Sequence, residues 1–493
     1  MKKYIVLGLL SALTITGCED FLEIDPQDSL TTTAFYTNAA DAVAAVNAAY
    51  DGVQHLNYYG FNYPIILNIA GGDAIKGGFG AGDRPAYLEL ETFDITPQNL
   101  RIQEFYAMAW GGVNRANQVL DNVSQMEISG DFTESLQTRI LGEATFLRAL
   151  HYYNLVLAFD GMPIYTSVPE INSEVLPRST TEETWQFIIS DFADAATMLP
   201  DSYDVANTGR ATKGAANAML ARIFALKGEW DKVDTYADLV LNSPVGYDLA
   251  PTFAENFDDR GNNNSESLFE IQYTLSNTSL DIWNSSGDWN SNFLATYSAP
   301  QVGGAGWSFM SPTQNLVDAF DEGDIRLGET VYRPGDAYGD GVFDPNNGDH
   351  FANAGLYGHK KLTGLVFDGS AENGFNYNYK IIRFAEVLLL KAEAQNELNG
   401  PTATAFNPLN RIRERASLDP VNAINNPGIT QEELRDIILH ERRVEFAMEG
   451  LFFYDAIYRG RGVEFFGARG YSPGDEIFPI PPSEIAQTGW SQN

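Results

Sequence analysis

Cysteine and basic side chains are both scarce in this chain. Cys18 is the single cysteine among 493 residues, which excludes an internal disulfide and a zinc site built from cysteine and histidine. Lysine and arginine number 31 against 66 aspartates and glutamates, for a formal net charge of −35. A chain this acidic is disfavoured as a ligand of nucleic acid or of anionic lipid headgroups.

Long hydrophobic runs are also missing after the N-terminus, so no further segment is expected to cross a membrane. Residues 4–15 are apolar, follow two lysines and are too short for a permanent span, as in a secretory signal. Ile15, Thr16 and Gly17 then precede Cys18, an order that resembles the lipobox of bacterial lipoproteins. We expect a signal peptide over 1–17, lipidation at Cys18 and membrane attachment through the lipid alone. A lipidated Cys18 leaves no catalytic thiol.

Signatures of catalysis are absent too. The sequence has no Gly-x-Ser-x-Gly elbow, no His-Glu-x-x-His motif and no Walker loop. We therefore assign no catalytic residue and expect no cofactor. Carboxylates are numerous and their separations are not visible in the sequence, so a surface glycosidase stays an alternative.

Residues 340–349 are the one acidic segment with some promise for a metal. Asp340, Asp344 and Asp349 could supply oxygen ligands to calcium, but their spacing does not fit an EF-hand. Because Asp, Asn and Gly also build turns, we favour a solvated turn and keep the three as weak calcium candidates.

Helical periodicity dominates what is present. Residues 133–159 carry an apolar stripe, and Thr180 with Glu183 resembles a capping box. Residues 221–237 follow the small–aromatic–Gly–aromatic–Ala spacing of a tetratricopeptide hairpin. The sequence thus predicts a mostly α fold, with a scaffold of tetratricopeptide-like helical hairpins, a loop-rich ligand face and a few short strands.

The texture of the chain changes in its middle. From residue 244 to 380 helical period largely disappears, and Gly, Asn, Asp and aromatics dominate. So much irregular chain indicates functional loops. We predict a lipidated leader over 18–37 and one domain over 38–493, with a helical half at 38–243, a loop-rich insert at 244–380 and C-terminal helices at 381–493.

Charged residues interrupt several of the apolar helical faces. Glu441, Arg442 and Arg443 lie among apolar positions of one predicted helix, as do Arg383 and Glu386 in another. An acid/base pair is one interpretation, but buried charges need partners in any case. We favour buried ion networks that fix helix packing.

Aromatic and polar residues outside the helices are candidates for ligand binding. Aromatic faces stack on the apolar faces of sugar rings, while Asn, Asp and Arg bond the hydroxyls. Ordinary loop packing is an alternative of about equal weight for residues 283–307. Chosen by region, the candidates are Tyr58, Tyr59, Asp73, Arg84, Trp283, Trp289, Asn292 and Trp307.

Several segments, taken in order, resemble the SusD/RagB family. The resemblance spans the whole chain, and its specificity comes from the number and order of loose motifs. One departure is Leu451-Phe452-Phe453-Tyr454-Asp455, where the family usually has His or Arg before Trp-Phe-Asp. The matching segments are GEATFLRALHYY at 142–153, GMP at 161–163, GRATKGAA at 209–216, ESLFEIQ at 266–272, IRFAEVLL at 382–389, ERR at 441–443 and FPIP at 478–481.

The resemblance implies a surface-exposed outer-membrane lipoprotein of Bacteroidota-type bacteria. It implies a non-enzymatic protein that binds glycan and serves as the lid of a SusC-like TonB-dependent transporter. The acidic balance of the chain favours a neutral polysaccharide such as a β-glucan. A lid that captures peptides is the main alternative.

Overall fold

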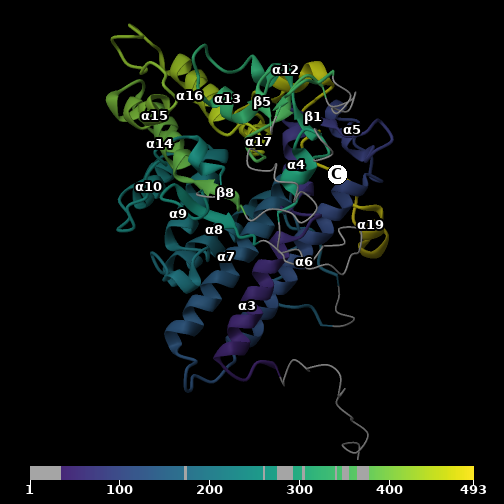
Figure 1. The fold of residues 1–493 in the computed structure, drawn as a ribbon. Coiled ribbons are helices and arrows are strands. Elements are labelled where there is room, and N and C mark those ends of the chain that lie inside the picture. The colour runs from purple at the N-terminus through teal and green to yellow at the C-terminus, as the bar shows by residue number, and fades with distance from the viewer. Residues whose placement is uncertain are drawn as a thin grey trace, which may run out of the picture.

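The computed structural model describes residues 35–170, 175–258, 261–274, 292–301, 306–338, 341–346, 355–363 and 377–493 (Figure 1). Helices make up most of it. Those of the first half are α3 Ala39–Gln54, α4 Asn62–Ala70, α5 Ala86–Thr92, α6 Leu100–Val123, α7 Glu134–Phe159, α8 Thr181–Met198, α9 Lys213–Leu226 and α10 Trp230–Leu241.

The second half opens with three short helices, continues with longer ones and closes with short ones. They are α11 Leu294–Ser298, α12 Gln314–Val317, α13 Arg326–Thr330, α14 Phe384–Asn399, α15 Ala403–Arg415, α16 Gln431–Glu445, α17 Phe452–Tyr458, α18 Gly462–Phe466 and α19 Pro482–Thr488. Single 3-10 turns lie at Val205–Asn207, Ala254–Asn256 and Gly467–Arg469.

The strands are short and form antiparallel pairs, of which β1–β3 and β2–β8 join distant parts of the chain and β5–β6 is local. β2 and β8 join the start and end of the loop-rich insert, and β1 and β3 join the insert to the loop after α4. The pairs are β1 Ala74–Gly77 with β3 Phe309–Pro312, β2 Ser267–Ile271 with β8 Tyr379–Arg383, β4 Val331–Tyr332 with β7 Gly358–His359, and β5 Ala337–Tyr338 with β6 Gly341–Val342.

Helices that follow one another pack as hairpins, as the sequence predicts. α7 packs on α8, α9 on α10 and α14 on α15, while α3 lies against α6 and α7 (Figure 1). In the α9–α10 hairpin Gly228 makes the turn at φ +69°, and Phe224 stacks on Tyr236 with ring centroids 5.5 Å apart. The predicted capping box is present, because Thr180 and Glu183 bond each other's backbone at the start of α8. The predicted mostly α fold is confirmed.

One buried core runs from Ala42 to Ile480. The division into residues 38–243, 244–380 and 381–493 stays a prediction. Among the described residues, no helix is both long enough and apolar enough to span a membrane.

Candidate ligand-binding site

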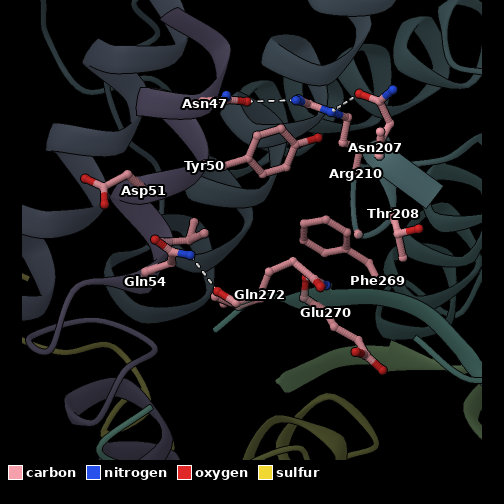
Figure 2. A pocket seen from close by; sticks show the side chains of 14 residues that line it. Asn47, Tyr50, Asp51, Gln54, Asn207, Thr208, Arg210, Phe269, Glu270 and Gln272 are labelled. Carbon is pink, nitrogen blue, oxygen red and sulfur yellow. Dashed lines mark hydrogen bonds between the residues drawn. The ribbon is translucent and has the colours of Figure 1, made fainter. Parts of the chain in front are cut away.

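A cleft of about 240 Å³ lies between α3, residues 206–210 and β2 (Figure 2). Polar side chains line it, and several of them are bonded to one another. The Arg210 guanidinium donates to Asn47 Oδ1 at 2.9 Å, to Asn207 Oδ1 at 3.0 Å and to Glu143 Oε2 at 2.8 Å. Gln54 Nε2 donates to the carbonyl of Gln272 at 2.5 Å. These bonds tie the walls of the cleft together, which indicates a structural role for the GRATKGAA segment.

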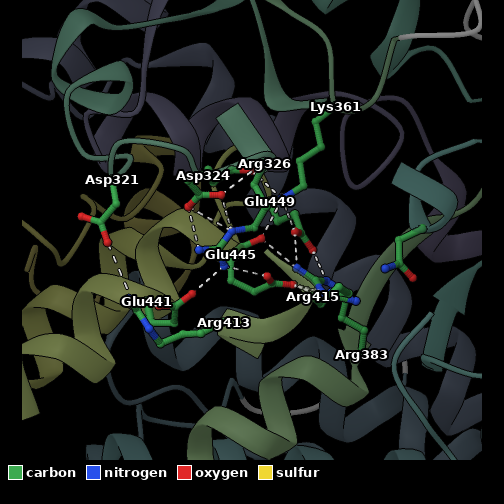
Figure 3. Close-up of polar contacts among 12 residues, drawn as sticks. Asp321, Asp324, Arg326, Lys361, Arg383, Arg413, Arg415, Glu441, Glu445 and Glu449 are labelled. Atoms are coloured by element: carbon green, nitrogen blue, oxygen red, sulfur yellow. Dashed lines mark hydrogen bonds and ion pairs between the residues drawn. The ribbon is translucent and has the colours of Figure 1, made fainter. Parts of the chain in front are cut away.

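Charged groups gather in a second place, between α13, β8 and α16 (Figure 3). Arg326 pairs with Asp324 at 2.7 Å, with Glu441 at 2.6 Å and with Glu445 at 3.0 Å, and all four side chains are buried. Arg383 joins this network, since it donates to Glu445 from the adjacent strand β8. The predicted interpretation as a buried ion network is therefore confirmed for this helix face.

The electrostatics of the network also argue for a structural role. Burial by itself raises the pKa of Glu445, but Arg415, Arg383 and Arg326 together bring it well below its ordinary value. A carboxylate held ionised by three guanidinium groups is a poor general acid or base near neutral pH. Glu386 is paired in the same way, with Arg222 and Arg442.

A third place, at the β1–β3 pair, brings two of the sequence-predicted residues together. Gly77 lies opposite Phe309, and the Gly78 N–H donates to the Ser308 carbonyl at 2.9 Å. A Cβ on Gly77, whose φ is +67°, would lie 1.9 Å from the Ser308 oxygen, so this crossing requires glycine. The loop that leads to Arg84 thus runs beside the segment that carries Trp307.

Lys76 holds that loop in place. Its buried Nζ donates to the carbonyls of Gly77 at 2.8 Å, Gly80 at 2.9 Å and Asp83 at 2.7 Å. Burial lowers the pKa of Lys76, and Asp83 and Glu91 oppose that shift. At the tip of the loop Phe79 is 61% exposed. The loop therefore presents an aromatic side chain on an ordered backbone.

Arg84 is half-buried between two aromatic rings. Its guanidinium carbon lies 4.9 Å from the ring centroid of Phe61 and 5.2 Å from that of Tyr297. Nη2 donates to the Tyr297 hydroxyl at 3.2 Å, which is the one side-chain hydrogen bond of Arg84 within the described residues. A guanidinium has five N–H donors, so the other four have no hydrogen-bond partner within the described residues.

Trp307 completes the group. The half-buried indole packs edge-on against Tyr297, with ring centroids 4.5 Å apart and planes at 71°. Its backbone N–H donates to the Thr296 carbonyl at 3.0 Å, which fixes the indole beside α11. We name Phe61, Arg84, Tyr297 and Trp307 the Arg84–Trp307 cluster.

Tyr58 and Tyr59 do not have the predicted surface role. They are 0% and 6% exposed, and both hydroxyls accept from Asn154 Nδ2 on α7, at 2.7 and 2.8 Å. Tyr58 also stacks on His151. The segment after α3 folds inward against α6 and α7, so its tyrosines are core side chains and their prediction as stacking platforms is wrong.

Asp73 and Asn292 are also buried, contrary to the prediction that they contact ligand. Asp73 accepts from Arg443 Nη2 at 3.1 Å; burial raises its pKa and Arg443 opposes the rise. Asn292 donates to the Tyr377 carbonyl at 3.0 Å and accepts from the Leu294 N–H at 2.8 Å, at the start of α11. Both side chains support the frame around the cluster.

Several other candidates lie outside the described residues: Cys18, Trp283, Trp289, Asp340 and Asp349. Asp344 is described, and its carboxylate accepts the Asn346 N–H at 2.9 Å, as in an Asx turn. Within the described ranges no three His, Cys, Asp or Glu side chains are grouped so as to hold a metal ion.

The sequence reasoning missed Phe79, and it did not select Phe61 or Tyr297 as site residues. Phe61 and Tyr297 matter because they hold the Arg84 guanidinium. One signal for Phe79 was present: an aromatic residue flanked by glycines at 77, 78 and 80 is typical of a tight loop with an exposed tip. Nothing in the sequence alone pairs Tyr297 with a residue 213 positions earlier.

Two family models match this chain. The one described as "Starch-binding associating with outer membrane" matches residues 20–225, and the one described as "SusD family" matches residues 265–469. The chain belongs to the SusD/RagB family. The resemblance found in the sequence is thereby confirmed.

Individual SusD-like proteins resemble the chain over nearly its whole length. SusD-like protein P2 of Formosa agariphila is 28% identical, over 99% of this chain and 98% of that protein. A SusD-like protein of Bacteroides ovatus is 26% identical over 93% of this chain and 82% of its own length. Among solved structures, a laminarin-binding SusD-like protein superposes with a TM-score of 0.78 at 27% identity, covering 93% of this chain and 99% of that one.

Proposed function

We propose that this SusD-like protein captures a neutral glycan at the cell surface and delivers it to a SusC-like TonB-dependent transporter, as the lid of that transporter. The observation that carries the binding part is the Arg84–Trp307 cluster. The Arg84 guanidinium lies between the rings of Phe61 and Tyr297, and the half-buried Trp307 indole packs against Tyr297. Only one of the guanidinium N–H groups is bonded within the described residues. Phe61 and Tyr297 are buried, so the indole of Trp307 is the ring of the cluster that a sugar can contact, and the Arg84 N–H groups are the donors for its hydroxyls.

The surroundings of the cluster support a preorganised site. Lys76 fixes the loop from one side, and α11 fixes Tyr297 and Trp307 from the other. A site whose side chains are already ordered loses little entropy when a ligand binds. Phe79, exposed on the same loop, offers a further ring to a longer ligand.

The choice of a neutral glycan, and of a β-glucan among them, has two supports. The net charge of −35 disfavours polyanionic polymers. A relative of similar length is named for laminarin binding, whereas one matching family model is named for starch. We infer a β-glucan and make an α-glucan the control ligand.

The remaining parts of the proposal concern place and role. We infer lipidation at Cys18 and a position on the outer membrane, supported by the lipobox-like order and by the outer-membrane description of the matching family model. Binding without turnover is supported by the pairing of the buried carboxylates around Glu445 and Glu386. Membrane fractions of cells that carry Cys18→Ala should release the protein, and retention of this variant in the membrane would contradict the anchor.

Calorimetry with laminarihexaose, maltohexaose and a mixed peptide library tests the binding role. We expect saturable binding of laminarihexaose that is reduced at least tenfold by Trp307→Ala. Ile424→Ala, at a residue 88% exposed, is the matched surface control and should bind as the wild type does. Binding of peptides with no binding of either glycan would replace the glycan role by the alternative of a peptide-capturing lid.

A further inference from the structure

A second aromatic concavity, of about 520 Å³, lies on α6 and shares no lining residue with the Arg84–Trp307 cluster. One link between the two is Glu104 on the wall of the concavity, because the Glu104 carboxylate is close enough to Arg84 for a coulombic interaction. The walls of the concavity come from the first turns of α6, the segment at 163–165 and the C-terminal region at α19, which lies beside α6 in Figure 1. Its aromatic lining consists of Tyr106, Trp110, Tyr165 and Trp490. We name it the α6–α19 groove. Its volume is in the range of small-ligand sites.

Two polar groups lie side by side in the α6–α19 groove, and neither has a hydrogen-bond partner outside this pair among the described residues. They are the hydroxyl of Tyr106, a residue only 4% exposed, and the indole N–H of Trp110. The two side chains are neighbours, with ring centroids 6.2 Å apart. Burial raises the pKa of Tyr106, and a side-chain hydrogen bond from Trp110 opposes that rise. The Trp110 N–H is therefore satisfied by Tyr106, and the Tyr106 O–H has no acceptor among the described residues. Buried polar groups are nearly always bonded, so a buried O–H donor that lines a concavity indicates a ligand acceptor.

The aromatic walls are held rigidly. Trp110 packs edge-on against Tyr152 at 5.7 Å and against Tyr165 at 5.9 Å. The Tyr152 hydroxyl donates to the Pro163 carbonyl at 3.0 Å and accepts the Tyr165 N–H at 2.8 Å, which fixes the 163–165 segment. Trp490, half-buried, faces the same space from the C-terminal side. The indole and phenol rings are therefore positioned before any ligand arrives.

An acceptor completes the set of polar groups. Glu484, at the start of α19, is half-buried, and its carboxylate has no ion pair or hydrogen bond among the described residues. Burial raises its pKa. By contrast, Glu104 on the same wall is already paired with Arg101 at 2.8 Å. The groove thus offers the Tyr106 O–H donor and the Glu484 carboxylate acceptor between aromatic rings.

This combination selects among possible occupants. An anion would meet the carboxylates of Glu484 and Glu104, and an apolar chain would leave the Tyr106 O–H unbonded. A proline-rich peptide suits the rings but has few N–H groups for Glu484, since proline carries none. Sugar hydroxyls both donate and accept, and the apolar face of a pyranose ring fits against indole.

We propose that the α6–α19 groove is a second binding site for a neutral glycan. The proposal shares with the proposed function only the class of ligand, and it holds or fails on different residues. If one polysaccharide chain occupies both sites at once, the protein binds the polymer more tightly than either site alone would. A short oligosaccharide that reaches only one site gains no such affinity.

The test uses the mature full-length protein labelled with 5-fluorotryptophan and fluorine NMR. The Trp490→Phe and Trp110→Phe variants assign the two resonances by their disappearance. In the Trp307→Ala background, we then titrate laminarihexaose, cellohexaose, maltohexaose and mannohexaose. The expected result is a saturable shift of the Trp110 and Trp490 resonances with at least one of these sugars. In Trp490→Ala the shift of the remaining Trp110 resonance should be lost. In the control Val463→Ala, a substitution at an exposed residue outside the groove, both shifts should be kept.

The outcomes separate the two proposals. No shift of either resonance with any of the four sugars overturns the groove as a glycan site, and so does a shift produced only by a polyproline peptide. If Trp307→Ala does not change calorimetric binding but the Trp490 resonance still shifts, the Arg84–Trp307 cluster fails and the groove stands. Thermal unfolding of Trp490→Ala checks that the loss of binding is not a loss of fold.

Discussion

Charged side chains are treated in opposite ways in two regions of this molecule. Around α16, arginine and glutamate side chains are buried and satisfy one another, as Arg326, Glu441 and Glu445 do (Figure 3). At the β1–β3 face, Arg84 is half-buried and donates one hydrogen bond, to the Tyr297 hydroxyl. The difference teaches that burial of charge alone does not mark a functional site. The number of hydrogen-bond donors that a buried charged side chain keeps without a partner is the more informative property.

The test with the largest expected effect removes one arginine from the buried ion network around α16. Arg383 donates to Glu266 at 2.7 Å, to Glu449 at 3.0 Å and to Glu445. Arg383→Met leaves these buried carboxylates short of a partner, and we expect a loss of about 3–5 kcal/mol in the free energy of unfolding. Urea denaturation measures it.

A matched control is available on the surface. Arg411 pairs with Asp248, and both side chains are largely exposed. Arg411→Met should cost less than about 1 kcal/mol. An equal cost for the two variants would mean that the buried network contributes no more than a surface ion pair, and the comparison would fail at its first step.

An intermediate test concerns His359, whose two ring nitrogens are buried without a hydrogen-bond partner among the described residues. Burial, with a smaller contribution from Lys361, lowers the pKa of His359 to about 3. Between about pH 6.5 and 3 the unfolded chain binds a proton at His359 that the folded chain does not. Stability therefore falls as the pH falls through this window, by up to about 1.4 kcal/mol per pH unit from this residue.

Urea denaturation of the wild type and of His359→Leu from pH 8 to pH 4 isolates this contribution. Above pH 7 the two stability curves should run parallel. Below pH 6.5 the wild-type curve should fall more steeply than that of the variant. Parallel curves over the whole range would show that the folded protein accommodates a charged imidazole at this position.

The sequence predicted the scaffold far better than the site, and the reason is physical. Helix stripes, the capping box at Thr180 and the α9–α10 hairpin depend on neighbours within a few residues, so their spacing is visible in the chain. Arg84 and Trp307 were selected by region, and both contact Tyr297 only because β1 pairs with a strand more than 230 residues later. Tyr58 was predicted to lie in an exposed loop. Its segment folds inward through contacts with α7, such as the hydrogen bond from Asn154, and the local sequence does not reveal these contacts.

The buried ion pairs occupy a middle position. An arginine or glutamate on an apolar helical face indicates a buried charge, and a buried charge needs an oppositely charged or hydrogen-bonding partner. Glu441 and Arg442 could therefore be assigned a structural role from the sequence. The identity of the partner could not. Arg442 pairs with Asp455 at 2.9 Å and Glu441 with Arg326, which lies on α13 in the loop-rich insert. Long-range pairing, not local pattern, decides these contacts.

The test with the smallest expected effect replaces Arg84 of the Arg84–Trp307 cluster and keeps its positive charge. Arg84→Lys retains a cation but loses the planar guanidinium that lies between Phe61 and Tyr297 and offers several donors at once. We expect about a tenfold loss of affinity for laminarihexaose, equivalent to about 1.4 kcal/mol, with the midpoint of urea unfolding nearly unchanged. Calorimetry and denaturation on the same samples separate the two effects. A loss of stability without a loss of affinity would place Arg84 with the structural arginines of α16, because its contacts would then serve the fold and not a ligand.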